Sequence, residues 1–193
     1  MIKAVIFDCF GVLYTDGRSQ IIEACPDEKR QALNDLFLQA DYGYISGNDF
    51  SIAVTELLNM EASVFAAMTD GVYARNELLV ERIRSYKKSY KIGLLSNVSE
   101  NLFVDLFHPE DQAALFDAVV LSSRVGMIKP SEAIYLLAAD QLGVSPHEAV
   151  MIDDIERNVQ GARDAGMQGI QFTSTPQVIA DLDALLAEKV HHA

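Results

Sequence analysis

The sequence predicts an α/β protein with a Rossmann-like parallel sheet and a helical segment inserted after the first strand. Five short apolar runs, rich in Val, Ile, Leu or Phe, have the composition of strands that are buried on both faces. Amphipathic helical patterns separate the later runs, and this alternation is typical of a parallel sheet with right-handed crossovers. The exception is a long stretch after the first run, which contains several amphipathic helices and no convincing strand.

The elements can be placed from hydrophobic periodicity and from the residues that start and stop helices. Strands are predicted over residues 2–8, 91–96, 117–122, 149–153 and 169–173, and helices of the sheet region over residues 99–107, 131–142, 155–165 and 176–188. Residues 145–148 have the form of a capping box, which makes His147 a surface residue of a short turn and not a catalyst.

The insertion carries helical patterns over residues 26–40, 49–60, 63–70 and 76–90. A helical insertion after the first strand lies over the carboxyl edge of the sheet, so it forms a lid unless it only extends the core. The 193 residues suit one α/β domain with such an insertion. We therefore expect an α/β core of residues 1–14 and 91–193 and a helical cap of residues 15–90.

The net charge of the chain limits the kinds of molecule that it is expected to bind. The chain has 28 acidic and 15 basic residues and a formal net charge of −13. Such a protein repels nucleic acid and anionic membranes, which bind basic patches. Lys87 and Lys88 are only a short basic pair of the kind found on a solvated helix face. The C-terminal His191 and His192 are expected to be a frayed tail and not a metal site.

Cysteine content and hydropathy give an expected location. Cys9 and Cys25 are too few for a disulfide framework, which favours a reducing compartment. Asp8 interrupts the first apolar run too early for a signal peptide, and no stretch has the length of a membrane span. We expect a soluble, cytoplasmic protein.

Reactive side chains stand where the predicted strands end. Asp8 ends the first strand, Ser96 ends the second, and the pair Asp153 and Asp154 follows another, while Lys129 stands in a loop before a helix. The carboxyl ends of parallel strands form the ligand crevice of such sheets. A carboxylate, a hydroxyl, a lysine and an acidic pair together suit nucleophilic attack on a metal-bound phosphate.

Each residue also has a plainer interpretation. Asp8 can form an acyl-phosphate or simply cap a turn, and Ser96 can donate to a phosphate oxygen or cap a helix. Lys129 stands at a helix start, which disfavours a cation unless an anion faces it. Asp153 and Asp154 suit Mg²⁺, although one of them could cap the next helix. Asn158, one turn into that helix, could orient the pair.

The ordered motifs resemble the haloacid dehalogenase (HAD) superfamily of phosphohydrolases. They are Asp8-Cys9-Phe10-Gly11-Val12-Leu13, Ser96-Asn97, Lys129-Pro130 and Asp153-Asp154, and they extend over essentially the whole chain. Residues 121–130 and 152–162 are most similar to the sugar-phosphatase-like branch, to which bacterial glucose-1-phosphatase belongs. The resemblance implies a capped HAD fold.

The resemblance also implies roles for the residues of these motifs. Asp8 attacks phosphorus, and Lys129 and Ser96 assist catalysis. Asp154 binds Mg²⁺ directly, Asp153 assists directly or through water, and Asp8 and the carbonyl oxygen of Phe10 are further ligands. The phosphoryl group is held by Cys9, Phe10, Ser96, Asn97 and Lys129. The expected activity is Mg²⁺-dependent hydrolysis of a small phosphorylated metabolite, such as a sugar phosphate, through an aspartyl-phosphate.

One position departs from the usual phosphatase pattern. Most phosphatases of this superfamily have an aspartate two residues after the nucleophile, where this chain has Phe10. Losing that general acid–base group typically costs ~10²–10⁴-fold in rate. The substitution points to a good leaving group, to an acid from the substrate or cap, or to slow turnover. Asp16 is a candidate substitute, although it is also an ordinary turn residue.

Three alternatives follow from the same residues. A 2-haloacid dehalogenase has an aromatic residue at the Phe10 position and uses a cap arginine, for which Arg18 and Arg30 are available, but an acidic pair would repel its substrate. A response-regulator receiver domain is smaller and has its acidic pair after the first strand. A degenerate member could bind a ligand without turnover.

Tyr42 and Tyr44 are cap residues that could set substrate specificity.

Overall fold

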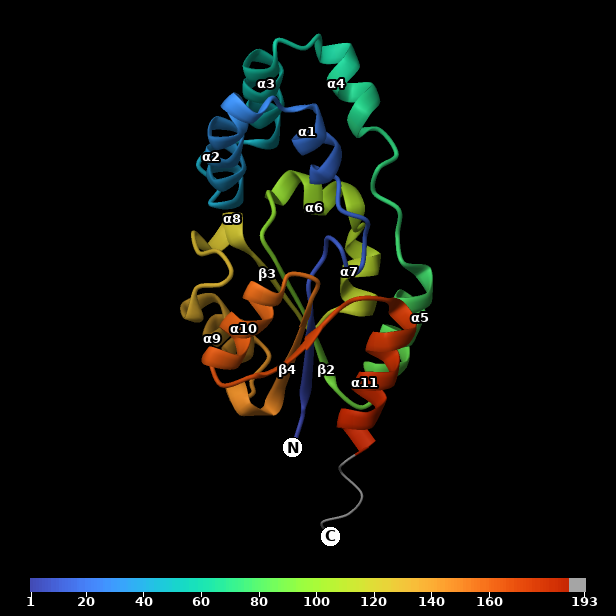
Figure 1. The fold of residues 1–193 in the computed structure, drawn as a ribbon. Helices are drawn as coiled ribbons and strands as arrows, with labels where there is room; N and C mark the ends of the chain where they lie inside the picture. Colours follow the sequence, from blue (N-terminus) through green and yellow to red (C-terminus); the bar gives the residue numbers. More distant parts are fainter. Residues whose placement is uncertain (188–193) are drawn as a thin grey trace.

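Five parallel strands form one sheet in the order β3-β2-β1-β4-β5 (Figure 1). This computed structural model describes residues 1–187. The strands are β1 (Ala4–Phe7), β2 (Lys91–Ser96), β3 (Ala118–Leu121), β4 (Ala149–Asp153) and β5 (Gln168–Gln171). All five predicted strands are present and all pair in parallel, so the predicted α/β fold class is confirmed.

Helices cover both faces of the sheet. Along β1, Val5 and Phe7 join the core on one face and Ala4 and Ile6 join the core on the other, because successive side chains of a strand alternate. The first face carries α5 (Glu77–Tyr86), α6 (Glu100–Leu106), α7 (Pro109–Leu115) and α11 (Thr175–Ala187). The second face carries α9 (Glu132–Gln141) and α10 (Glu156–Asp164), as Figure 1 shows.

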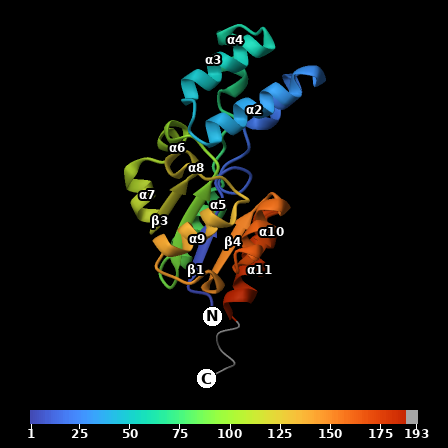
Figure 2. The ribbon, with the colours of Figure 1, turned by 90° about the vertical axis from the view of Figure 1, so that its left-hand side faces the viewer.

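Four further helices lie beyond the carboxyl ends of the strands (Figure 2). They are α1 (Arg18–Ala24), α2 (Arg30–Asp41), α3 (Gly47–Leu58) and α4 (Ala62–Thr69), with a 3₁₀ turn at Asp27–Lys29 before α2. Their buried side chains form a third apolar cluster that includes Ile21, Leu33, Phe37, Val54 and Phe65. These helices therefore have a small core of their own.

Helix α5 packs differently from the rest of residues 15–90. Its buried side chains, Leu79, Val80, Ile83 and Tyr86, belong to the core on the sheet. The predicted boundary of the cap at residue 90 stays a prediction, and this packing favours placing the boundary before α5.

Most predicted helices agree with the structure to within a few residues, but three short ones were not predicted: α1, α7 and α8 (Ser122–Val125). The turn at Pro146–Glu148 has the predicted capping box, in which Glu148 accepts a hydrogen bond from the Ser145 N–H at 3.2 Å. The predicted end of the last helix at residue 188 and the predicted His191–His192 tail lie outside the described residues.

Within residues 1–187, no single helix is long and apolar enough to cross a membrane. Helices α3 and α4 reach that length and hydropathy only when taken together, and the chain bends by 115° between them.

Candidate active site

The carboxyl ends of β1, β2 and β4 bring the predicted reactive residues together at one edge of the sheet. Asp8 directly follows β1, and its N–H donates to the carbonyl oxygen of Ile152 at 2.9 Å. Ser96 and Asp153 are the last residues of β2 and β4. A cavity of about 560 Å³ opens there, and Asp8, Ser96 and Lys129 are among its lining residues. The pleat and register of the sheet thus place residues distant in sequence around one space.

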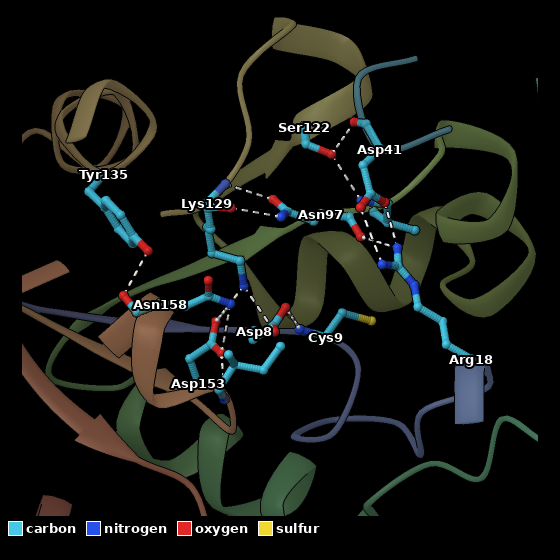
Figure 3. A network of polar contacts seen from close by, with 12 residues as sticks. Asp8, Cys9, Arg18, Asp41, Asn97, Ser122, Lys129, Tyr135, Asp153 and Asn158 are labelled. Carbon is cyan, nitrogen blue, oxygen red and sulfur yellow. Dashed lines mark hydrogen bonds and ion pairs between the residues drawn. The ribbon is translucent and has the colours of Figure 1, made fainter. Parts of the chain in front are cut away.

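The ammonium group of Lys129 lies between two carboxylates (Figure 3). Its Nζ is 2.9 Å from Asp8 Oδ2 and 2.5 Å from Asp153 Oδ2. All three side chains are buried, and Lys129 is only 2% exposed. Burial would lower the pKa of Lys129, but the carboxylates of Asp8 and Asp153 outweigh it and raise that pKa above its ordinary value. Lys129 is therefore a fixed cation at the centre of the site.

The carboxyl group of Asp8 has a perturbed pKa. Burial raises its pKa to about 7, and the nearby Asp153 adds to this effect although Lys129 opposes it. The N–H of Cys9 donates to Asp8 Oδ1 at 2.6 Å. A single lysine does not offset the burial of these carboxylates, so a further cation at this position would favour the ionised form of Asp8.

Helix α10 holds Asp153 in place. Asn158 Nδ2 donates to both carboxylate oxygens of Asp153, at 3.0 and 3.2 Å, and the N–H of Ile155 donates to Oδ1 at 2.9 Å. The Tyr135 hydroxyl donates in turn to the carbonyl oxygen of Asn158 at 2.7 Å. Asn158 therefore lies against Asp153, where it can fix the orientation of that carboxylate.

The carboxylates fit a divalent cation. Oxygen atoms of Asp8, Asp153 and Asp154 all lie within 4.8 Å of one another. Among the described residues, the buried Asp154 Oδ1 has no hydrogen-bond partner. A Cβ at Gly11, where φ is +77°, would lie 2.3 Å from Asp154 Oδ2, so only glycine lets the loop approach this carboxylate. Hard oxygen donors in this number suit Mg²⁺. Ligation by the Phe10 carbonyl stays a prediction.

The residues predicted to hold a phosphoryl group differ in what they offer. Ser96 Oγ is buried and has no hydrogen-bond partner among the described residues, so it is available to a ligand. The side chain of Asn97 binds the Lys129 backbone instead: Lys129 N–H donates to Oδ1 at 2.9 Å, and Nδ2 donates to the Lys129 carbonyl at 3.2 Å. Asn97 thus positions Lys129. Burial, and then Asp8, raise the pKa of the Cys9 thiol, and Cys9 contributes only its backbone N–H to the network.

Phe10 and Asp16 both line the cavity. The Phe10 ring lies against Tyr73, with ring centroids 5.4 Å apart. The carboxylate of Asp16 accepts hydrogen bonds from the Arg18 N–H and from Ser19 Oγ, each at 3.0 Å, at the start of α1. Asp16 therefore has a structural role as a helix-start acceptor, and its suggested role as a general acid stays a prediction.

An ion pair that was not predicted from the sequence joins α1 and the end of α2. Arg18 Nη2 and Nη1 donate to the two oxygens of Asp41 at 2.5 and 3.2 Å, and Arg18 also lies over the Phe37 ring. Both charged side chains line the cavity. Asp41 is a buried acidic residue at the end of a helix, but the 23 residues that separate it from Arg18 hide the pairing in the sequence.

Other cap residues named from the sequence lie elsewhere. Arg30 NH2 donates to Asp27 Oδ1 at 3.3 Å and to the Cys25 carbonyl, and it is not among the residues that line the cavity. Tyr42 and Tyr44 stack on each other with centroids 5.3 Å apart and an interplanar angle of 9°. Neither tyrosine lines the cavity.

Known proteins resemble this chain in sequence. A model of the haloacid dehalogenase-like hydrolases matches residues 2–166. Glyceraldehyde 3-phosphate phosphatase from Methanopyrus kandleri is 43% identical, over 89% of this chain and 84% of that protein. Bifunctional epoxide hydrolase 2 from Rattus norvegicus is 40% identical over 68 residues, so the match spans only 12% of that relative.

The fold also matches solved structures. A HAD family enzyme from Bacteroides thetaiotaomicron, in complex with magnesium and inorganic phosphate, superposes with a TM-score of 0.73 at 22% identity. The match covers 91% of this chain and 96% of that chain. At this identity the likeness concerns the fold alone.

Proposed function

The chain belongs to the haloacid dehalogenase-like hydrolases, and we propose that it is a Mg²⁺-dependent phosphatase that uses Asp8 as its nucleophile. The proposed substrate is a small phosphorylated metabolite. The observation that carries the proposal is a cluster of three carboxylates at the sheet edge, two of which, Asp8 and Asp153, pair with the buried Lys129. The phosphatase activity in the name of the Methanopyrus kandleri relative supports it.

The acidic cluster favours phosphoryl transfer over dehalogenation. A 2-haloacid carries its own carboxylate, which Asp153 and Asp154 would repel beside Asp8. Mg²⁺ bound at these carboxylates would neutralise negative charge on the phosphoryl group and on Asp8. That need for neutralisation is inherent in phosphoryl transfer, where catalysis is mainly positioning and electrostatic stabilisation.

The residues of the chain then have distinct tasks. An oxygen of Asp8 attacks phosphorus, and the bond to the leaving-group oxygen breaks with its electron pair on that oxygen. Lys129 Nζ and Ser96 Oγ donate hydrogen bonds to phosphoryl oxygens, while Asn97 and Asn158 hold Lys129 and Asp153. Water later hydrolyses the aspartyl-phosphate and regenerates Asp8. Phe10 supplies no proton, so the rate depends on how well the leaving group carries negative charge.

Phosphate release tests this proposal. The substrates are aryl, anomeric sugar and primary alkyl phosphates, each assayed with Mg²⁺ and with EDTA. We expect Mg²⁺-dependent release that is fastest for the better leaving groups, and a loss of more than ~10³-fold in Asp8→Asn. Asp164→Asn, at an exposed aspartate of α10, is the matched control and should keep the wild-type rate.

Two outcomes would contradict the proposal. Turnover that survives in Asp8→Asn would remove Asp8 as the nucleophile. Halide release from 2-haloacids, without phosphate release from any ester, would favour the dehalogenase alternative that the aromatic Phe10 suggests.

A further inference from the structure

The wall of the reaction cavity carries a matched pair of charges beyond the catalytic group. Arg18 and Asp41 line it together with Asp16, Asn34 and Arg157. Building on the phosphatase function above, we propose that the Arg18–Asp41 pair selects phosphomonoesters whose leaving group is a neutral polyol, and rejects esters that carry a second anion. The pair would thus set the chemical class of the substrate.

The pair is fixed from several sides. Asp41 is 5% exposed, and its backbone carbonyl accepts from Ser122 Oγ at 2.5 Å, which ties the end of α2 to the core. The guanidinium of Arg18 lies 4.8 Å above the Phe37 ring centroid, and its Nη2 also donates to the Asn97 carbonyl at 3.5 Å. Figure 3 shows Arg18, Asp41 and Asn97 converging beside Lys129. Arg18 is therefore held next to Asn97, whose side chain positions the proposed phosphate-binding Lys129.

The exposed member of the pair is the arginine. Its side chain is 38% exposed, whereas that of Asp41 is 7% exposed. A guanidinium has five N–H donors, and three hydrogen bonds of Arg18 go to Asp41 and Asn97. The remaining donors can bind hydroxyl oxygens of a leaving group without disturbing the pair.

Binding is less favourable when the leaving group carries an anion of its own. If this anion bound only the remaining donors, it would face a guanidinium whose charge Asp41 already neutralises. To become the main partner of Arg18, it must displace the bidentate bonds that Arg18 donates to Asp41, which are of the strong, charge-assisted kind. Asp41 would then remain buried without its cation, which is strongly unfavourable. A neutral hydroxyl carries no such penalty, so the pair discriminates by charge.

The other charges of the cavity wall do not duplicate this effect. Asp16 and Arg157 are both exposed, so solvent screens them more than it screens Asp41. Asp16 also serves as a control, because it contributes one negative charge to the same cavity without binding the Arg18 guanidinium.

The test uses two ligands with the same three-carbon skeleton: glycerol 3-phosphate, which has a diol, and 3-phosphoglycerate, which has a carboxylate. Calorimetry measures their Kd values in the presence of Mg²⁺, with all variants made in the Asp8→Asn background so that no turnover occurs. We expect glycerol phosphate to bind at least tenfold tighter. Asp41→Asn should free Arg18 and shift the Kd ratio at least tenfold toward phosphoglycerate, whereas Asp16→Asn should shift it less than threefold.

A second variant covers the case in which Asp41→Asn does not fold. Arg18→Gln should weaken glycerol phosphate binding at least tenfold and leave the Kd of inorganic phosphate unchanged. Equal Kd values for the two ligands, binding of neither, or the same shift from both aspartate variants would overturn the inference. Its failure is distinguishable from that of the phosphatase proposal, which Asp8-dependent release of phosphate from p-nitrophenyl phosphate tests independently.

Discussion

The buried ammonium group of Lys129 pairs with two carboxylates, and a third carboxylate lies close by. Burial, together with this excess of negative charge, raises the pKa of Asp8. Lys129 pairs with both Asp8 and Asp153, yet burial still raises the pKa of Asp8 to about 7. Without a metal ion, the folded protein therefore binds a proton on Asp8 that the unfolded chain releases near pH 4.

This linkage predicts how metal-free stability depends on pH. Because the pKa of Asp8 is raised on folding, the free energy of unfolding falls as pH rises from about 4 to about 7. The asparagine side chain in Asp8→Asn does not titrate, so this variant lacks the pH-dependent loss. The free energy of unfolding of Asp8→Asn minus that of the wild type should therefore increase between pH 4 and pH 7, by on the order of 2–4 kcal/mol. Urea unfolding in EDTA at pH 4, 6 and 8 measures it. A stability difference that stays constant with pH would contradict the assigned charge state.

At the scale of elements, the sequence predicts those strands and helices whose positions are set by a local pattern of residues. The central strands β1, β2 and β4 are almost entirely buried and therefore appear as apolar runs, and the polar residues at their carboxyl ends, Asp8, Ser96 and Asp153, mark the site. Helices α1, α7 and α8 are short, and each buries a single side chain, so their periodicity is weak. The packing of α5 on the sheet, and the pairing of Arg18 with Asp41, depend on tertiary contacts that no local pattern contains.

The turn after β1 offers a test of how an element shapes the proposed metal site. Gly11→Ala places a methyl group on the carboxylate of Asp154, so we expect at least a tenfold loss of Mg²⁺ affinity, measured by calorimetry. Gly126→Ala is the matched control, because Gly126 also has a positive φ, +66°, but open space around a Cβ. The control should cost about 1–2 kcal/mol of stability and leave Mg²⁺ affinity intact. Equal effects of both on Mg²⁺ binding would attribute the loss to backbone strain alone.

At the scale of the whole molecule, three apolar clusters divide the packing. Two lie on the faces of the sheet, and the third lies among α1–α4. The seam between the third cluster and the sheet is polar, with the Arg18–Asp41 pair and the bond from Ser122 to the Asp41 carbonyl. A polar seam permits the helices over the sheet edge to open locally while the sheet stays folded.

Local stability should therefore differ between the two parts. Leu33 is fully buried in the third cluster, and Leu33→Ala should remove about 2–5 kcal/mol of packing energy. We expect hydrogen exchange to accelerate in α1–α4 while the amides of β1 and β4 keep their protection. Ile134→Ala, at a fully buried site against the sheet, is the control and should lower protection in the strands as well. If Leu33→Ala lowered protection equally in β1 and β4, helices α1–α4 and the sheet would form a single cooperative unit, and local opening of these helices alone would be contradicted.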